Sequence, residues 1–154
     1  CEVAVGVRAV LDAVGLVGWS TTSGSKGLPL YVPLNTPGGT HEETADLALA
    51  VGQVMDRQLP GRVTTVLATV ERRGTVFVDW SQNAHHKTTI APYSLRARHD
   101  PTVSTPVTWD EVARCAADGV ELRFEAADVL ERVEQHGDLF ADVLTLEQHL
   151  PTAS

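Results

Sequence analysis

The sequence predicts an α+β domain with a mostly antiparallel sheet and flanking helices. Helical patterns alternate with pairs of short strands rather than with single strands, which is typical of this class. Apolar residues recur at helical spacing in residues 1–15 and again after Thr40, whereas residues 16–22 and 28–34 read as a hairpin. With 154 residues and 43% hydrophobic content, the chain is long enough for one domain with a real core.

The first 15 residues have the pattern of a helix interior, and Gly15 is a stop signal. Neither an N-cap residue nor an initiator methionine precedes this pattern, because the chain begins at Cys1. We therefore expect further chain on the N-terminal side. Five apolar residues share one face of the helix: Val3, Val7, Val10, Leu11 and Val14.

Residues 23–27 form a polar turn bracketed by glycines, which joins the two strands of the predicted hairpin. Pro29 lies in the second strand and favours an edge position, a bulge or the first strand residue. A second helix is expected to start at Thr40, which has capping-box spacing to Glu43, and to end before Pro60. Its predicted buried stripe consists of Leu47, Val51, Val54, Met55 and Leu59.

The second half of the chain repeats these signals. We expect strands at residues 63–70, 75–78 and 88–91, with a turn near Gly74 between the first two. Thr108 and Glu111 have capping-box spacing and predict a short helix through about Ala117. Residues 125–135 predict another helix, with Leu130 and Val133 facing inward, and residues 139–144 a final helical turn or two.

Charge is spread unevenly along the chain. The net charge is −8, which alone argues against a nucleic-acid-binding protein. Residues 62–99, however, hold six Lys and Arg residues against two acids, so a basic face on an acidic body is possible. No apolar run approaches the roughly 20 residues of a membrane span, and no signal peptide is evident. Cys1 and Cys115 form neither a disulfide framework nor a metal-ligand spacing, which favours a reducing cytosol.

Residues 74–98 have the composition expected of a functional segment. The apolar strand 75–78 ends in Asp79, and residues 80–99 contain no acid at all. A carboxylate at a strand end, beside a basic and amide-rich segment, suits a site that holds a cation and a polyanion together. The alternative is a strand that leaves the core into a solvated loop. The basic residues of 80–99 are Lys87, Arg96 and Arg98, with His85, His86 and His99.

The turn 23–27 can be interpreted in two ways. Two glycines, two hydroxyls and Lys26 could cradle a phosphate, although the P-loop pattern Gly-Lys-Ser/Thr is absent. An ordinary hairpin turn is the alternative. His85 and His86 are adjacent and are expected to be exposed loop residues, while the three tryptophans are expected in the core or at its rim.

Taken together, three stretches resemble the polymerase domain of bacterial ligase D, the primase-polymerase of non-homologous end joining in the archaeo-eukaryotic primase superfamily. They are TSGSKGLPLYVPL at 22–34, VFVDWSQN at 76–83 and KTTIAPYSLRAR at 87–98. The segment VSTPVTWDEV at 103–112 matches as well. The resemblance runs from residue 1 to about residue 144, which makes residues 1–154 the C-terminal part of such a domain.

The resemblance implies an enzyme that adds ribonucleoside or deoxyribonucleoside triphosphates to a DNA primer end, with Mn or Mg as cofactor. Asp79 matches the third metal-binding, catalytic carboxylate of the family, whose Asp-x-Asp pair would precede Cys1. One carboxylate cannot hold two cations, so this chain alone is expected to be inactive. The implied partners are DNA ends, nucleoside triphosphates, and a ligase domain or end-binding proteins. The implied location is the bacterial cytoplasm near the nucleoid, with no membrane.

The resemblance also implies roles for further residues, according to their positions in the matching motifs. Ser23, Lys26, Arg72 and Arg98 match residues that bind the nucleotide's phosphates, and Gln82 and Asn83 lie in the motif beside the metal. Lys87 and Arg96 are weaker candidates for phosphate or DNA contacts.

One departure from the family pattern is Pro29, where the family has a histidine. It favours a second hypothesis, a divergent non-catalytic paralogue that binds DNA ends or partners. An unrelated nucleotide-binding α+β domain is a third.

Overall fold

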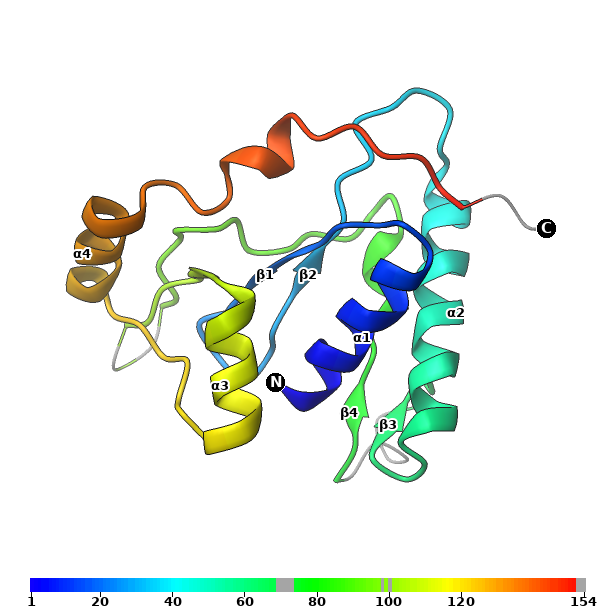
Figure 1. Ribbon diagram of the computed structural model, residues 1–154, viewed down its shortest axis with the longest axis horizontal. Helices are drawn as coiled ribbons and strands as arrows, with labels where there is room; N and C mark the ends of the chain where they lie inside the picture. The colour runs from blue at the N-terminus through cyan, green and yellow to red at the C-terminus, as the bar shows by residue number, and fades with distance from the viewer. Residues whose placement is uncertain (69–73, 98, 100, 152–154) are drawn as a thin grey trace.

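The computed structural model describes residues 1–68, 74–97, 99 and 101–151. Figure 1 shows α1 in the middle of the molecule, with α3 on one side and α2 on the other. Two small sheets lie beside these helices, so the α+β prediction is confirmed. The elements are α1 (Glu2–Ala13), β1 (Trp19–Thr21), β2 (Leu30–Tyr31), α2 (His41–Gln58), β3 (Val63–Thr64), β4 (Val76–Phe77), η2 (Trp80–Asn83), β5 (Pro106–Val107), α3 (Trp109–Asp118), α4 (Ala126–His136) and η3 (Ala141–Leu144).

The larger sheet is antiparallel and has the strand order β2-β1-β5. Trp19 lies opposite Tyr31, and Ser20 lies between Leu30 and Val107. The predicted hairpin is therefore confirmed, with β2 at the sheet edge, where Pro29 was expected. The amide of Thr21 donates to the Pro29 carbonyl at 3.0 Å, one residue before β2 begins.

The smaller sheet pairs β3 with β4 in parallel, with Val63 opposite Val76. The sheets are thus mostly, but not wholly, antiparallel. The predicted strand at 88–91 is wrong: those residues are largely exposed and have no strand conformation. β-branched residues such as Thr88 and Thr89 favour strands only where a neighbouring strand offers packing, and these two have none.

The helix starts follow the sequence closely. Both predicted capping boxes are present: the Thr40 and Thr108 hydroxyls accept hydrogen bonds from the amides of Glu43 and Glu111, whose carboxylates bond back. The helix at Ala126–His136 also forms, but its predicted inward face is wrong. Leu130 and Val133 are 69% and 41% exposed, whereas Val129 is buried and the Arg132 side chain is mostly covered.

The core is built around α1. Its N-terminal half contributes Ala4 to a cluster with Val107 and Val112, and its C-terminal half contributes Leu11 to a cluster with Leu16 and Val51. One helix therefore contacts both neighbouring helices and the antiparallel sheet. The tryptophan side chains are half-buried at the rim, as expected, and the indoles of Trp80 and Trp109 donate to backbone carbonyls.

Gly52 allows the smaller sheet to approach α2. A Cβ at this position would lie 2.6 Å from Cγ2 of Thr65 and 3.1 Å from Cγ1 of Val78. Atoms do not pack at such distances, so any larger residue would push the strand away from the helix. Because Asp79 follows Val78 directly, this close contact also fixes the place of the candidate carboxylate.

A disulfide joins Cys1 to Cys115, which corrects the expectation of two unconnected cysteines. The two residues are 114 positions apart in sequence, yet their Cα atoms lie 5.9 Å apart. Sequence spacing could not reveal this pairing, because it arises only when the start of α1 packs beside α3. The bond ties the first residue of the chain to the helix that follows β5.

Reduction of this disulfide is expected to lower the free energy of unfolding by about 2–4 kcal/mol, because the bridge closes a long loop in the unfolded chain. Urea unfolding with and without dithiothreitol measures the difference. A variant with both Cys1→Ser and Cys115→Ser is the control, and its unfolding should not respond to the reductant. Equal unfolding midpoints for the oxidised and reduced wild-type chain would contradict the prediction.

Candidate functional site

The turn between β1 and β2 is organised by Ser23. Its amide donates to the Gly27 carbonyl at 2.9 Å, and its hydroxyl oxygen accepts the amides of Ser25 and Gly27 at 3.2 and 3.1 Å. Two amides of the predicted phosphate cradle are therefore directed at Ser23 rather than at a ligand. A hydroxyl has two acceptor positions and one donor. With both acceptors engaged, Ser23 Oγ is left as a donor, the role that a phosphate oxygen requires.

Arg96 packs against this turn, although it lies about 70 residues further along the chain. A Cβ on Gly24 would lie 2.6 Å from Cγ of Arg96, and Gly24 has a φ of 65°. Glycine is thus needed there both for its backbone conformation and for the close contact. Thr102 fastens the arrangement, since its carbonyl accepts the Arg96 amide at 2.8 Å and its hydroxyl donates to the Gly24 carbonyl at 2.5 Å.

Tyr93 holds the segment before Arg96 in place. Its backbone amide donates to the Ser104 carbonyl at 2.6 Å, and its phenol donates to Oδ1 of Asp138 at 2.6 Å. Burial, followed by this hydrogen bond to a carboxylate, raises the pKa of the Tyr93 phenol well above its usual value. Tyr93 also has a φ of 66°, a conformation that non-glycine residues rarely adopt. The segment is therefore held in a defined position beside residues 102–105.

A pocket of about 940 Å³ opens beside the turn. This volume lies within the roughly 300–1,000 Å³ typical of small-molecule sites. The pocket is lined by Lys26 of the turn and by the segment Gly119–Phe124, which forms one wall and includes the basic residue Arg123. The cysteines of the disulfide also line the pocket. Lys26, predicted from sequence as a phosphate ligand, therefore faces a cavity large enough for a nucleotide.

Asp79 lies at the N-terminal end of the short helix η2, after β4, and is exposed. Its Oδ1 accepts the Ser81 hydroxyl at 2.6 Å, and its Oδ2 accepts the Gln82 side-chain amide at 3.3 Å. The structure therefore brings Gln82 to Asp79, as the motif suggested. Carboxylate oxygens have more than two acceptor positions, so Asp79 can still bind a cation while these contacts persist.

The remaining candidates are less connected to one another. The Asn83 side chain donates to the Trp80 carbonyl within η2, and the Asn83 carbonyl contacts the His41 ring at 3.0 Å. His85 and His86 are exposed, as expected, and Lys87 is exposed on the same loop. Arg72 and Arg98 lie outside the described residues, so their predicted position near Asp79 stays a prediction.

The described residues do not form a complete metal site. Within those ranges, no group of three or more His, Cys, Asp or Glu side chains is arranged to hold an ion. Among the site residues predicted from the sequence, Asp79 is the one with carboxylate oxygens, the donors that Mg and Mn prefer.

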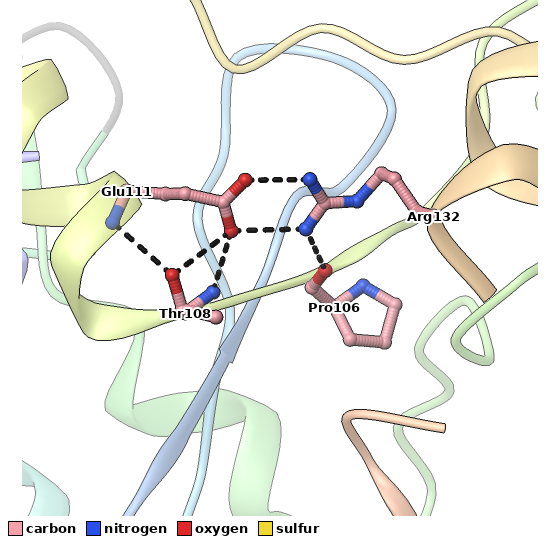
Figure 2. Close-up of polar contacts among 4 residues, drawn as sticks. All are labelled: Pro106, Thr108, Glu111 and Arg132. Carbon is pink, nitrogen blue, oxygen red and sulfur yellow. Dashed lines mark hydrogen bonds and ion pairs between the residues drawn. The ribbon is translucent and has the colours of Figure 1, made fainter. Parts of the chain in front are cut away.

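A largely buried ion pair that the sequence did not predict joins the two helices that flank the segment Gly119–Phe124. Figure 2 shows the Glu111 carboxylate between the Arg132 guanidinium and the Thr108 backbone, with N–O distances of 2.5 and 2.9 Å to the two guanidinium nitrogens. Arg132 also donates to the Pro106 carbonyl at 3.2 Å. The pair thus ties α3, β5 and α4 together around the segment Gly119–Phe124. No local sequence signal marks a pair 21 residues apart.

Comparison with known proteins identifies the family. The family model described as LigD, primase-polymerase domain, matches residues 1–140. The chain belongs to this family. It is 47% identical over 141 residues to the multifunctional non-homologous end joining protein LigD of Mycolicibacterium smegmatis, covering 92% of the chain and 18% of that protein. The bifunctional non-homologous end joining protein LigD of Bacillus subtilis is 29% identical over 148 residues, or 96% of the chain and 24% of that protein.

A solved structure supports the same assignment. The polymerase domain of Mycobacterium tuberculosis ligase D in complex with DNA matches this LigD-family chain with a TM-score of 0.84 and 44% identity. The match covers 92% of the chain and 48% of that structure. The chain therefore spans about half of the solved polymerase domain and about a fifth of the curated LigD proteins.

Proposed function

We propose that the chain is part of a primase-polymerase domain that adds nucleotides to DNA ends during non-homologous end joining. The observation that carries the proposal is the arrangement of Ser23, Lys26 and Arg96 around one turn, in a fold similar to a polymerase domain solved with DNA. A hydroxyl donor, a lysine and an arginine form the donor set that phosphate groups prefer. The partners proposed from the relatives are DNA ends and a ligase domain or end-binding proteins, in the bacterial cytoplasm near the nucleoid.

Each candidate residue has a role in this proposal. Lys26 and the hydroxyl of Ser23 contact the phosphates of the incoming nucleoside triphosphate, and Arg72 and Arg98 are proposed to complete that set. Gln82 orients Asp79 through its side-chain amide. The contacts with DNA or with outer phosphates are assigned to Arg96, Lys87 and Asn83.

Divalent cations, Mn or Mg, belong to the proposed reaction. Asp79 is the ligand that this chain contributes, and the Asp-x-Asp pair expected before Cys1 would supply the others. Such cations activate the attacking 3′-hydroxyl and stabilise the leaving pyrophosphate when bound. The chain 1–154, with one suitable carboxylate, is expected to give no primer extension with manganese. Robust primer extension by this chain alone would contradict the proposal that it carries only one of the metal-binding carboxylates.

Nucleotide binding by the chain itself provides a direct test. Lys26→Gln is expected to weaken ATP binding by about 10-fold, because a charge-assisted hydrogen bond to phosphate is lost. Isothermal titration with ATP measures the effect, and Arg57→Gln, at an exposed position in the last turn of α2, is the control. Unchanged affinity in Lys26→Gln would contradict the proposed phosphate site.

A second function, a non-catalytic module that binds DNA ends or partners, is favoured by one observation. Pro29 stands where the family has a histidine, and proline has no side-chain or backbone donor for a phosphate. The upstream sequence distinguishes the two functions, because an Asp-x-Asp pair before Cys1 supports the enzyme and its loss supports the binding module. Primer extension by the intact domain then provides the functional answer.

A further inference from the structure

The wall of the pocket formed by Gly119–Phe124 carries an arginine, Arg123, to which the proposed site gives no role. Residues 119–124 connect α3 to α4 and form neither helix nor strand. Leu122 and Phe124 are half-buried and pack against the core, whereas Glu121 and Arg123 are exposed. This alternation is that of an extended chain with one face on the core. Arg123 therefore projects from a segment whose neighbours are anchored.

The segment is fastened at three points. The amide of Val103 donates to the Phe124 carbonyl at 2.9 Å, which joins the wall to the residue after Thr102. The disulfide holds Cys115 near its beginning, and the Glu111–Arg132 pair holds the two flanking helices. A side chain on such a segment loses less freedom on binding than one on an unanchored loop. The backbone around Arg123 is therefore held in place before a ligand binds.

Arg123 can leave its ion-pair partner at a small cost in free energy. Its guanidinium lies 3.6 Å from the Glu125 carboxylate, and both side chains are well exposed, at 42% and 63%. Exposed pairs of this kind contribute little to stability. A guanidinium has five N–H donors, so Arg123 can bind phosphate oxygens while it stays near Glu125. Of the residues that line the pocket, Lys26 and Arg123 are cationic and Glu121 is anionic, whereas Glu125, the partner of Arg123, lies outside the lining.

The pocket combines these cations with an apolar surface. Leu28, Leu122 and Phe124 line it together with the disulfide. Its volume of about 940 Å³ far exceeds that of a single phosphate and suits a ligand with both an anionic and an apolar part. A nucleoside triphosphate has this chemistry, since a polyphosphate chain adjoins a flat base.

We propose that Arg123 is a second phosphate-binding residue, which contacts the polyphosphate of a nucleoside triphosphate in the pocket that it lines together with Lys26. This inference rests on the proposed function, because it assumes the nucleotide that Lys26 binds. It extends the site to the segment Gly119–Phe124, which the sequence motifs leave out. The base and sugar then lie along the apolar lining contributed by Leu28 and Leu122.

The test uses the whole chain in its oxidised form, in EDTA-containing buffer, titrated with ATP, tripolyphosphate and adenosine. Arg123→Gln is expected to weaken ATP and tripolyphosphate binding by about 10-fold and to leave adenosine binding unchanged, because the lost contact is to phosphate. Arg114→Gln, at an exposed position of α3 outside the pocket, is the matched control and should bind as wild type. Urea unfolding of each variant verifies that the fold is kept.

The outcomes separate this inference from the proposed function. Unchanged binding in Arg123→Gln, with weakened binding in Lys26→Gln, would overturn the role of Arg123 and leave the phosphate site intact. Unchanged binding in both variants, or no binding of ATP and tripolyphosphate by the wild-type chain at millimolar concentration, would overturn both. Arginine-selective labelling with phenylglyoxal gives an independent readout: ATP should protect Arg123 and not Arg114, and equal labelling of Arg123 with and without ATP would contradict the proposal.

Discussion

Asp79→Asn in the intact polymerase domain is expected to lower manganese-dependent primer extension by at least about 100-fold. Even residues that only support metal ligands change affinity or activity 10–100-fold when replaced, so loss of a ligand should have a larger effect. Asparagine keeps the shape and one acceptor oxygen, which preserves a contact to Ser81 or Gln82. Primer extension on a DNA end with increasing manganese measures the change.

Asp142→Asn is the matched control for this experiment, since Asp142 is an exposed acid in η3. Its activity should equal that of the wild-type domain. Activity of Asp79→Asn within about threefold of wild type, or less than about 0.7 kcal/mol in barrier height, would remove Asp79 from the catalytic site. Circular dichroism of the variant confirms that the loss is chemical rather than structural.

Arg132→Met is expected to destabilise the chain by about 3 kcal/mol. The Arg132 and Glu111 side chains are only 15% and 16% exposed, so removal of one partner leaves a poorly solvated charge on the other. The substitution also removes the donor to the Pro106 carbonyl. Urea unfolding at neutral pH measures the difference in the free energy of unfolding.

Arg62→Met provides the comparison, because Arg62 pairs with Glu2 at the surface, where the side chains are 59% and 54% exposed. That variant should lose much less stability than Arg132→Met, because exposed ion pairs contribute little. Similar losses in Arg62→Met and Arg132→Met would show that burial does not strengthen the Glu111–Arg132 pair. The conservative variant Arg132→Lys should lie between wild type and Arg132→Met, since lysine keeps the charge without the planar fork.

The same ion pair predicts how stability depends on pH. Burial by itself would raise the pKa of the Glu111 carboxyl, but hydrogen bonds from Arg132 and Thr108 outweigh it and hold the pKa below its usual value of 4.5. The stabilisation by Glu111 is therefore fully present above about pH 4.5 and is lost as the pH falls through the lower pKa of the folded state. Unfolding of wild type should become easier below pH 4.5, and this dependence should be weaker in Arg132→Met.

Local features of the fold could be predicted from the sequence. The capping boxes at Thr40 and Thr108 involve residues three positions apart, so the pattern contains the whole interaction. The hairpin and its edge proline depend on neighbouring residues as well. The orientation of α4 could not be predicted, because its inward face is set by Arg132 reaching Glu111 on another helix. The disulfide and the parallel pairing of β3 and β4 likewise depend on contacts between distant segments.

The candidate site likewise has features that the sequence predicts and features that it does not. The glycine-bracketed turn and the acid at the end of β4 are visible in the sequence, since each is a short pattern with a physical reason. The use of the Ser25 and Gly27 amides by the Ser23 hydroxyl is not visible, because several turn geometries fit the same residues. The contact of Arg96 with Gly24 and the position of Arg123 in the lining of the same pocket as Lys26 require the folded chain.

Pro29 limits both the hydrogen bonding and the flexibility of the hairpin. Thr21 donates its amide to the Pro29 carbonyl, but the proline ring has no N–H to return, so the ladder stops there and β2 begins one residue later. The same ring fixes the backbone torsion directly after the turn that carries Lys26. The turn 23–27 is therefore followed by a rigid backbone position. It loses less conformational entropy on binding a ligand than a turn followed by a flexible residue would. A histidine at position 29 would lack this rigidity, but it would add a side-chain hydrogen-bond donor and a backbone N–H for one more hydrogen bond in the sheet.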